Sequence, residues 1–213
     1  MTREELLKIA KPILFNTEMV QAILEGRKTV TRRIIPRNWF GQESIDKNDS
    51  SYLYFPDEYG DYHHAKDLCR YQVGDILYVR ETFQKLDSSL AADLSLGEYA
   101  YVYKASENGK NWEENMENWK WKPSIHMPKK AARIFLKVTD VRVEKLQDIT
   151  KDYSNFNKEG IKEEHGFRSE MHREFIDLWD STIKKQDLNR YGWDANPWVW
   201  VIEFERVEED LKW

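Results

Sequence analysis

The residue types that can do chemistry are concentrated in one short segment of this chain, ILEGRKTVTRR. It contains Lys28 and Thr31, an amine and a hydroxyl three residues apart, and it adds three cations: Arg27, Arg32 and Arg33. A hydroxyl becomes a nucleophile when a base takes its proton, and a lysine acts as that base where burial or neighbouring cations lower its pKa. The segment predicts either an activated nucleophile or a basic edge that binds phosphate. A solvated basic strand edge is the plain structural alternative.

Lys28 and Thr31 converge only under one geometric condition. Residues i and i+3 of a strand face opposite sides, so the chain must twist or turn just after Gly26. Gly26 is the expected stop of a helix over 18–25, and β-branched residues predict a strand over 29–35. The two side chains are therefore expected where a helix ends and a strand begins.

Two further polar groups are candidate pocket residues. Arg80 and Glu81 end a predicted strand, where they form either part of a pocket or a buried structural ion pair. Trp121 and His126 lie in a proline-bounded segment that we expect to be extended, and they could stack on a base and hydrogen-bond to it. The basic run that follows, Lys129, Lys130 and Arg133, is expected to be solvated surface.

The sequence predicts neither a metal nor a cofactor. His63, His64 and Cys69 are close in sequence, with Asp61 and Asp67 beside them, but the paired ligand spacings of zinc sites are missing. The chain has no GxxxxGK or GxGxxG phosphate loop and no GxSxG nucleophile elbow.

Composition indicates a globular protein with a sizeable core. The 213 residues are 40% hydrophobic and 33% charged, with a net charge of −5, one cysteine and nine tryptophans. The sequence contains no run of eighteen apolar residues, so it predicts no membrane-spanning helix. The single cysteine excludes an internal disulfide, and we therefore expect a cytoplasmic protein. Because the net charge is negative, any nucleic-acid contact must come from a local patch, or the ligand must be small. Most tryptophans are expected in the core.

The pattern of elements predicts an α+β domain around a small mixed β-barrel, with flanking helices and insertions. We expect one domain over 1–213, with an insertion at 37–70 and a second irregular region at 88–118. The expected helices cover 2–9, 18–25, 148–159 and 169–183. The expected strands cover 13–15, 29–35, 76–81, 98–104, 132–146 and 198–207, with a bulge or bend at Thr139–Asp140.

The basic segment resembles the signature of the ASCH domain family, Gly-x-Lys-x-x-Glu-x-Arg, through Gly26, Lys28, Thr31 and Arg33. Further blocks resemble phage- and prophage-type members, among them YQVGDILYVRET, ARIFLKVTDVRVEKLQDI and WDANPWVWVIEFER. The resemblance implies a PUA-like β-barrel and a pocket for RNA or a nucleoside.

The chain departs from that signature at Thr31, which stands in place of glutamate. The small bacterial ASCH enzymes that deacetylate N-acetylcytidine are similar in carrying threonine there. This resemblance implies catalytic roles for Lys28, Thr31 and a later glutamate, for which Glu159 is the best match. Thr31 would attack the acetyl carbonyl or position a water, Lys28 would activate that nucleophile, and Glu159 would be general acid and base. The alternatives are a non-catalytic RNA-binding module and a phage accessory protein that acts through protein contacts.

Overall fold

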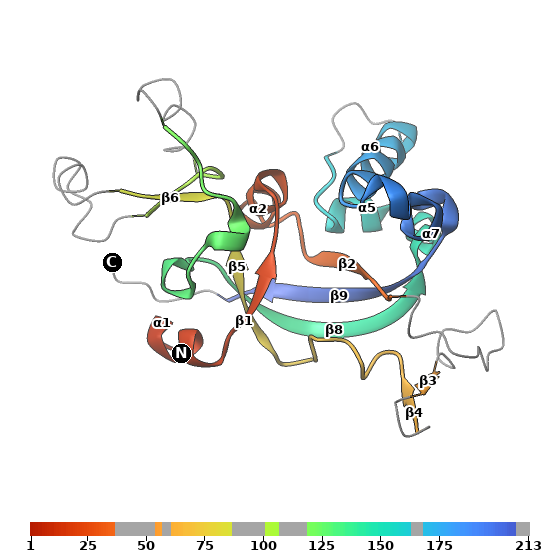
Figure 1. The fold of residues 1–213 in the computed structure, drawn as a ribbon, viewed down its shortest axis with the longest axis horizontal. Coiled ribbons are helices and arrows are strands. Elements are labelled where there is room, and N and C mark those ends of the chain that lie inside the picture. Colours follow the sequence, from red (N-terminus) through yellow and green to blue (C-terminus); the bar gives the residue numbers. More distant parts are fainter. Residues whose placement is uncertain (37–53, 57–60, 87–100, 107–118, 163–167, 208–213) are drawn as a thin grey trace. The chain divides into compact units, whose positions relative to one another are not determined.

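The chain folds into two compact units, each assembled from separate stretches of sequence. The structure is a computed structural model, and it describes residues 1–36, 54–56, 61–86, 101–106, 119–162 and 168–207 (Figure 1). Unit 1 consists of Met1–Gly26, Ile76–Lys137 and Arg206–Trp213, and unit 2 of Arg27–Asp75 and Val138–Glu205. Within the described ranges, no helix is long and apolar enough to cross a membrane.

A mixed five-stranded sheet is the central element of this α+β fold, with the strand order β1-β5-β8-β9-β2. The strands are β1 (Lys11–Leu14), β5 (Ile76–Arg80), β8 (Phe135–Lys145), β9 (Trp198–Arg206) and β2 (Val30–Ile34). β1 is parallel to β5, whereas β5 with β8 and β2 with β9 are antiparallel.

Two small antiparallel pairs accompany the sheet. In unit 2, β3 (Tyr54–Pro56) pairs with β4 (Tyr62–His64), and in unit 1, β6 (Phe83–Lys85) pairs with β7 (Tyr101–Tyr103). The first pair is a hairpin within the predicted insertion. Residues 37–53 and 57–60 of that insertion, and most of the irregular region 88–118, lie outside the described residues.

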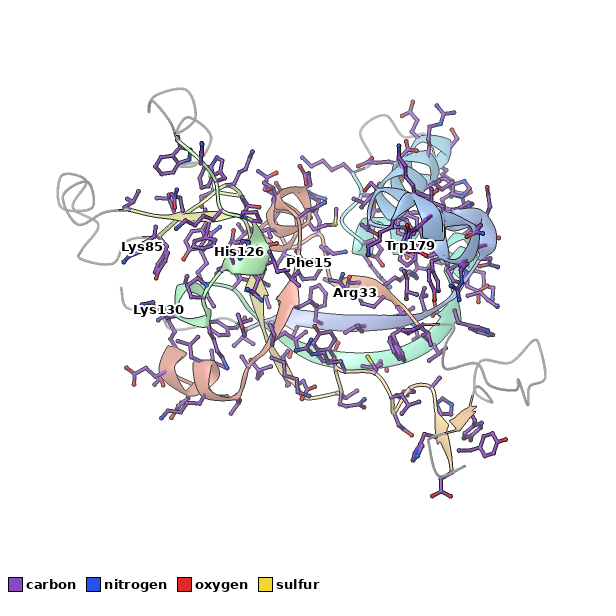
Figure 2. The ribbon with its side chains drawn as sticks, viewed as in Figure 1. Phe15, Arg33, Lys85, His126, Lys130 and Trp179 are labelled. Carbon is purple, nitrogen blue, oxygen red and sulfur yellow. The ribbon has the colours of Figure 1, made fainter. Side chains whose placement is uncertain are left out.

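The described residues of unit 1 include the α-helices α1 (Arg3–Ile9) and α2 (Thr17–Leu24). A capping box between Thr2 and Glu5 begins α1, as the sequence predicts, and Leu6 of that helix packs with residues of β5 and β8 in the core of the unit. Phe15, directly after β1, is also buried (Figure 2). Gly26 follows α2 with φ +75°, a conformation that glycine adopts without steric cost.

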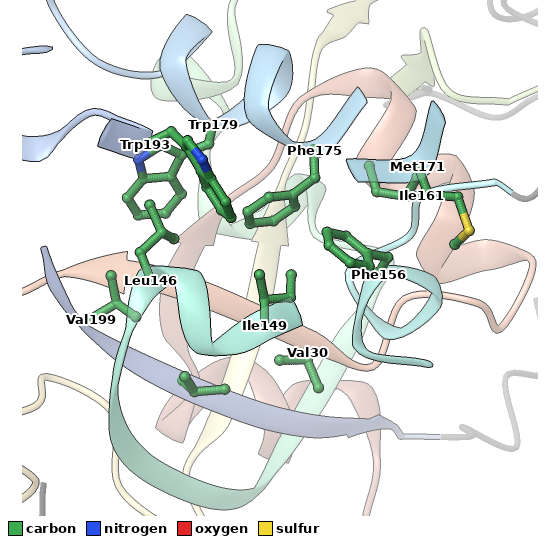
Figure 3. Close-up of a cluster of buried hydrophobic side chains, with 11 residues drawn as sticks. Val30, Leu146, Ile149, Phe156, Ile161, Met171, Phe175, Trp179, Trp193 and Val199 are labelled. Atoms are coloured by element: carbon green, nitrogen blue, oxygen red, sulfur yellow. The ribbon is translucent and has the colours of Figure 1, made fainter. Parts of the chain in front are cut away.

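Unit 2 carries α5 (Ser154–Lys158), α6 (Arg168–Ser181) and α7 (Leu188–Tyr191), which gather beside β2 and β9 (Figure 1). Their core is an aromatic cluster that packs on β-branched residues of the two strands (Figure 3). Phe156 is fully buried at its centre, with ring centroid distances of 5.6 Å to Phe175 and 5.9 Å to His172. This cluster fixes α5 against the sheet.

Two local predictions are wrong. The predicted helix 148–159 is split into a 3₁₀ helix, Leu146–Lys151, and the short α5. Between them Asp152 is extended, and its carboxylate accepts hydrogen bonds from the backbone N–H and the hydroxyl of Ser154. The segment after Pro123 is a 3₁₀ turn, Ser124–His126, rather than extended. In each case local hydrogen bonds outweigh a propensity that is weak in itself.

Candidate functional site

The C-terminus of α5 meets the segment that leads into β2. Gly160 ends the helix with φ +96°, and its carbonyl accepts a hydrogen bond from the Arg27 guanidinium. The Lys158 carbonyl accepts from the Thr29 backbone N–H at 2.9 Å. The last carbonyls of a helix have no partner within the helix, and here the basic segment supplies donors and positive charge to them. The basic segment before β2 therefore binds the C-terminal end of α5.

Lys28 makes the central contacts of this junction. Its Nζ donates to the Glu159 carboxylate Oε2 at 2.7 Å, to the Glu159 carbonyl at 2.8 Å and to the Val30 carbonyl at 2.7 Å. An ammonium has three N–H groups, so these acceptors match all of them. Lys28 is therefore held as a charged donor in this geometry, not presented as a base.

Arg32 binds the other oxygen of the same carboxylate. Its Nη1 lies 2.7 Å from Glu159 Oε1, and its Nη2 lies 3.4 Å from Glu144 Oε2. Lys28, Arg32 and Glu159 expose only 3%, 5% and 5% of their surface. Arg32 Nε is also buried, and it has no hydrogen-bond partner. An orphaned buried donor costs about 1–3 kcal/mol, so this atom requires an explanation.

The electrostatics of the three groups follow from burial and pairing. Burial alone would raise the pKa of Glu159, but the charges of Lys28 and Arg32, and their hydrogen bonds, lower it below its ordinary value. Burial lowers the pKa of Lys28, and the Glu159 carboxylate offsets part of that shift. Glu159 is consequently an ionised acceptor that two cations share.

The ion pairs continue from the buried centre to the surface of unit 2. Glu144 also binds Arg142, whose guanidinium contacts Asp140 and Glu203 as well. Asp140, Arg142 and Glu144 alternate along β8 and so share one face of it. Sequence reasoning missed this network, although the polar alternation D-x-R-x-E on a predicted strand was visible.

Thr31 lies on the other face of β2. Strand alternation directs it away from Arg32, and its partner in the register is Ile202, whereas Arg32 is opposite Val201. The chain does turn at Gly26, as expected, and Thr31 then lies in β2, which extends from Val30 to Ile34. The structure brings Lys28 to Glu159 and places the Thr31 hydroxyl, which is buried, on the opposite face.

Arg33 shares the face of Thr31, because the two residues are two positions apart in β2. Burial lowers the pKa of Arg33, and Tyr71 and Glu159 offset part of that effect. Burial also raises the pKa of the Tyr71 hydroxyl, which the positive charge of Arg33 partly offsets. Three residues of the predicted basic segment bind the end of α5: Arg27, Lys28 and Arg32. Arg33 lies on the face of β2 opposite to that of Arg32.

The remaining candidates belong to unit 1. Glu81 is almost fully buried and binds Arg133 through two hydrogen bonds of 2.8 Å, so it is a buried structural ion pair, with Arg133 as its partner. Burial raises the pKa of Glu81, and Arg133 offsets part of that rise. Arg80 donates through Nη2 to the Ile125 carbonyl, which anchors the 3₁₀ turn that contains His126.

Trp121 packs beside Trp119, with ring centroids 5.4 Å apart, against a small apolar cluster, while His126 is exposed. Both residues belong to unit 1, whereas the Lys28 cluster belongs to unit 2. In the parts of the chain that the structure describes, no group of three or more His, Cys, Asp or Glu side chains could hold a metal ion.

Comparisons with known proteins give no relative, since no family model, no curated protein and no solved structure matches the chain.

Proposed function

We propose that this protein binds a nucleoside or an RNA base at the cluster formed by Lys28, Arg32 and Glu159. The observation that carries the proposal is Arg32 Nε, a buried donor that has no partner inside a buried group of charges. A carbonyl or ring nitrogen of a base is an acceptor that would satisfy it. The resemblance to the ASCH domain family, and the PUA-like barrel that it implies, are part of the same proposal.

The chemistry of the cluster matches one edge of a pyrimidine. A cytosine-type base offers acceptors at its ring nitrogen and carbonyl, and a donor at its amino group. Arg32 supplies donors, and the Glu159 and Glu144 carboxylates supply acceptors. The burial of three charges is weak evidence that they stabilise the fold, because well-packed apolar residues at such positions often give equal stability. Groups with shifted pKa values also concentrate at functional sites. Both arguments favour a role in ligand binding, rather than in stability alone, for the buried charged cluster.

Calorimetric titration with cytidine and with N-acetylcytidine tests the proposal. Arg32→Lys retains the charge but removes the Nε–H, so we expect at least a tenfold loss of affinity. The control, Arg142→Lys, makes the same chemical change in the exposed part of the network and should alter affinity less than threefold. If neither ligand binds the wild-type protein, or if both variants behave alike, the proposed site is wrong.

A second candidate is hydrolysis of an N-acylated cytidine-type amide at the same cluster, favoured by the contact of Lys28 Nζ with Glu159 Oε2 at 2.7 Å. Water would add to the acyl carbon, the bond from that carbon to the exocyclic nitrogen would break, and the proton of the water would pass to the leaving amine. The positive charge of Lys28 would stabilise the oxyanion, and Glu159 would transfer the proton. A water molecule suits this face better than the Thr31 hydroxyl, which points to the other side of β2.

Release of cytidine from N-acetylcytidine measures this activity. Lys28→Met and Glu159→Gln should each lower kcat at least a hundredfold, whereas Thr31→Ala should change it less than fivefold. Binding without turnover would leave the binding proposal in place and remove the hydrolase. A large loss in Thr31→Ala would instead restore threonine as the nucleophile.

A further inference from the structure

Arg80, at the end of β5 in unit 1, has a buried N–H group that no acceptor satisfies. Its Nη2 donates to the Ile125 carbonyl, but its Nε is buried and has no hydrogen-bond partner among the described residues. A buried donor without a partner costs about 1–3 kcal/mol, and folded proteins rarely retain one without a reason. The Arg80 guanidinium therefore offers an N–H group to an acceptor from outside the chain.

A second cation lies on the same face of β5. Tyr78 is two residues before Arg80, so the two side chains share a face and their backbone positions are about 6.6 Å apart along the strand. Lys129 Nζ lies 5.4 Å from the centre of the Tyr78 ring. Within the described ranges neither Arg80 nor Lys129 contacts a carboxylate, because their contacts are the Ile125 carbonyl and the Tyr78 ring. This face of β5 therefore carries two cations that form no ion pair there.

Two exposed aliphatic residues adjoin the Arg80 guanidinium. Leu14 is opposite Arg80 in the parallel pair of β1 and β5, and it is 41% exposed (Figure 1). Ile125, whose carbonyl binds Arg80, is 60% exposed. Single exposed apolar residues are ordinary on a protein surface, but these two are the strand partner and the hydrogen-bond partner of one arginine. A ligand at Arg80 would therefore meet apolar surface beside the positive charge.

The Ile125 carbonyl also orients the guanidinium. It accepts from Nη2 and belongs to the 3₁₀ turn Ser124–His126, which hydrogen bonds from His126 N and Met127 N close. Met127, directly after the turn, is 1% exposed and packs with Tyr78 in the core of unit 1. The turn is thus fixed to the core, and it holds the planar group of Arg80 through one of its donors. A fixed guanidinium loses less side-chain entropy when a ligand binds.

We propose that Arg80, with Lys129, Leu14 and Ile125, binds a small organic carboxylate that has an aliphatic body. A carboxylate oxygen accepts from the Nε–H of a guanidinium, and Lys129 adds positive charge on the same face. The aliphatic body covers Leu14 and Ile125 and so removes apolar surface from water. Inorganic phosphate would accept from the same donors but has no apolar part. The four residues belong to unit 1, so this site is separate from the nucleoside cluster proposed in unit 2.

Proton–nitrogen NMR of the full chain, titrated with octanoate at pH 6.5, tests the proposal. The Nε–H signal of Arg80, identified by its loss in Arg80→Lys, should shift and saturate. Acetate has the charge without the aliphatic body, octanol has the body without the charge, and inorganic phosphate has charge alone. Each of the three should bind at least tenfold more weakly than octanoate. An Nε–H signal that does not move with octanoate, or equal affinity for any of the three, would overturn the proposal.

Variants separate the contributions of charge and apolar contact. Arg80→Lys retains the charge but removes the Nε–H, so octanoate affinity should fall at least tenfold. Lys129→Gln, which removes one charge, should lower it at least threefold. The double change Leu14→Ser and Ile125→Ser should lower octanoate affinity at least fivefold and leave acetate affinity within twofold of the wild type. An equal effect of the double change on both acids would refute the role assigned to the aliphatic residues.

Matched controls make the same chemical changes in unit 2. Arg142→Lys replaces a partly exposed arginine, and Val73→Ser replaces an aliphatic residue that is 56% exposed. Each should change octanoate affinity less than twofold, and a loss equal to that of the site variants would overturn the proposal. If Arg80→Lys unfolds, Ile125→Ser alone still tests the site, with an expected loss of at least twofold. Arg32→Lys should bind octanoate as the wild type does, which distinguishes this site from the proposed nucleoside cluster.

Discussion

Lys28 Nζ lies 2.7 Å from Glu159 Oε2, although 131 residues separate them in the chain. The contact joins the entry to β2 with the end of α5, and Arg32 shares the same carboxylate. Sequence similarity suggested that lysine and glutamate act together. The structure adds that they form a buried, mutually neutralising group in which every N–H of the lysine is used.

Glu159→Gln should cause a large loss of stability. The change retains the shape of the side chain but leaves Lys28 and Arg32 buried without their shared counter-charge. Breaking a buried pair in this way costs about 3–5 kcal/mol. Urea denaturation followed by tryptophan fluorescence measures the free energy of unfolding. Asp177→Asn, on the exposed face of α6, is the matched control and should cost less than about 0.5 kcal/mol. Similar losses in the two variants would contradict the buried pairing.

The stability should depend on pH with opposite signs for two buried glutamates. The folded-state pKa of Glu159 lies below its ordinary value, so its contribution is complete above the unfolded pKa, about 4.3, and is lost as the pH falls below that value. The folded-state pKa of Glu81 is raised. Its contribution to the free energy of unfolding is therefore complete below the unfolded pKa and is lost as the pH rises through the raised pKa.

Urea unfolding between pH 3 and 7 separates these two effects. Glu159→Gln should flatten the loss of stability on the acid side. Glu81→Gln should instead steepen the rise of stability as the pH increases above the unfolded pKa of glutamate, about 4.3, because the opposing contribution of Glu81 is gone. Parallel pH profiles for the wild type and the Glu159→Gln variant would show that Glu159 is not ionised and paired as described.

Phe156→Ala should unfold α5 from the sheet. Phe156 is fully buried between α6 and the strands, and it is two helical residues before the end of α5. Truncating a buried phenylalanine costs about 3–5 kcal/mol. Since α5 carries Glu159, ligand binding at the Lys28 cluster should fall together with stability. Phe156→Leu fills most of the space and should retain binding with a smaller loss. Retention of full stability by the alanine variant would mean that the aromatic cluster does not hold α5.

Gly26→Ala tests the left-handed conformation of the turn that precedes Lys28. At φ +75° an added Cβ meets no atom within 4 Å, so the cost is backbone strain alone, about 1–2 kcal/mol. Gly26→Asn should cost less, since asparagine tolerates this conformation. The measurement is the melting temperature of both variants beside the wild type. A more stable alanine variant would contradict the left-handed conformation.

The sequence by itself determined the elements whose signals are local. The capping box at Thr2, the stop at Gly26 and the apolar run of β9 depend on neighbours a few residues away, and the structure contains them. The α+β class followed from the same patterns. The sequence failed at 148–159, where the predicted helix is divided at Asp152, which is extended and whose carboxylate accepts hydrogen bonds from Ser154.

Only the tertiary structure decided the candidate site. No local rule predicts that Glu159 pairs with Lys28, or that Glu81 pairs with Arg133 and not with its sequence neighbour Arg80. These partners are far apart in sequence and meet through the packing of whole elements. Strand alternation was known in advance, but the side that Thr31 faces depended on which face of β2 the helices cover. Burial then decided the charge states, because desolvation and partners set a pKa and sequence shows neither.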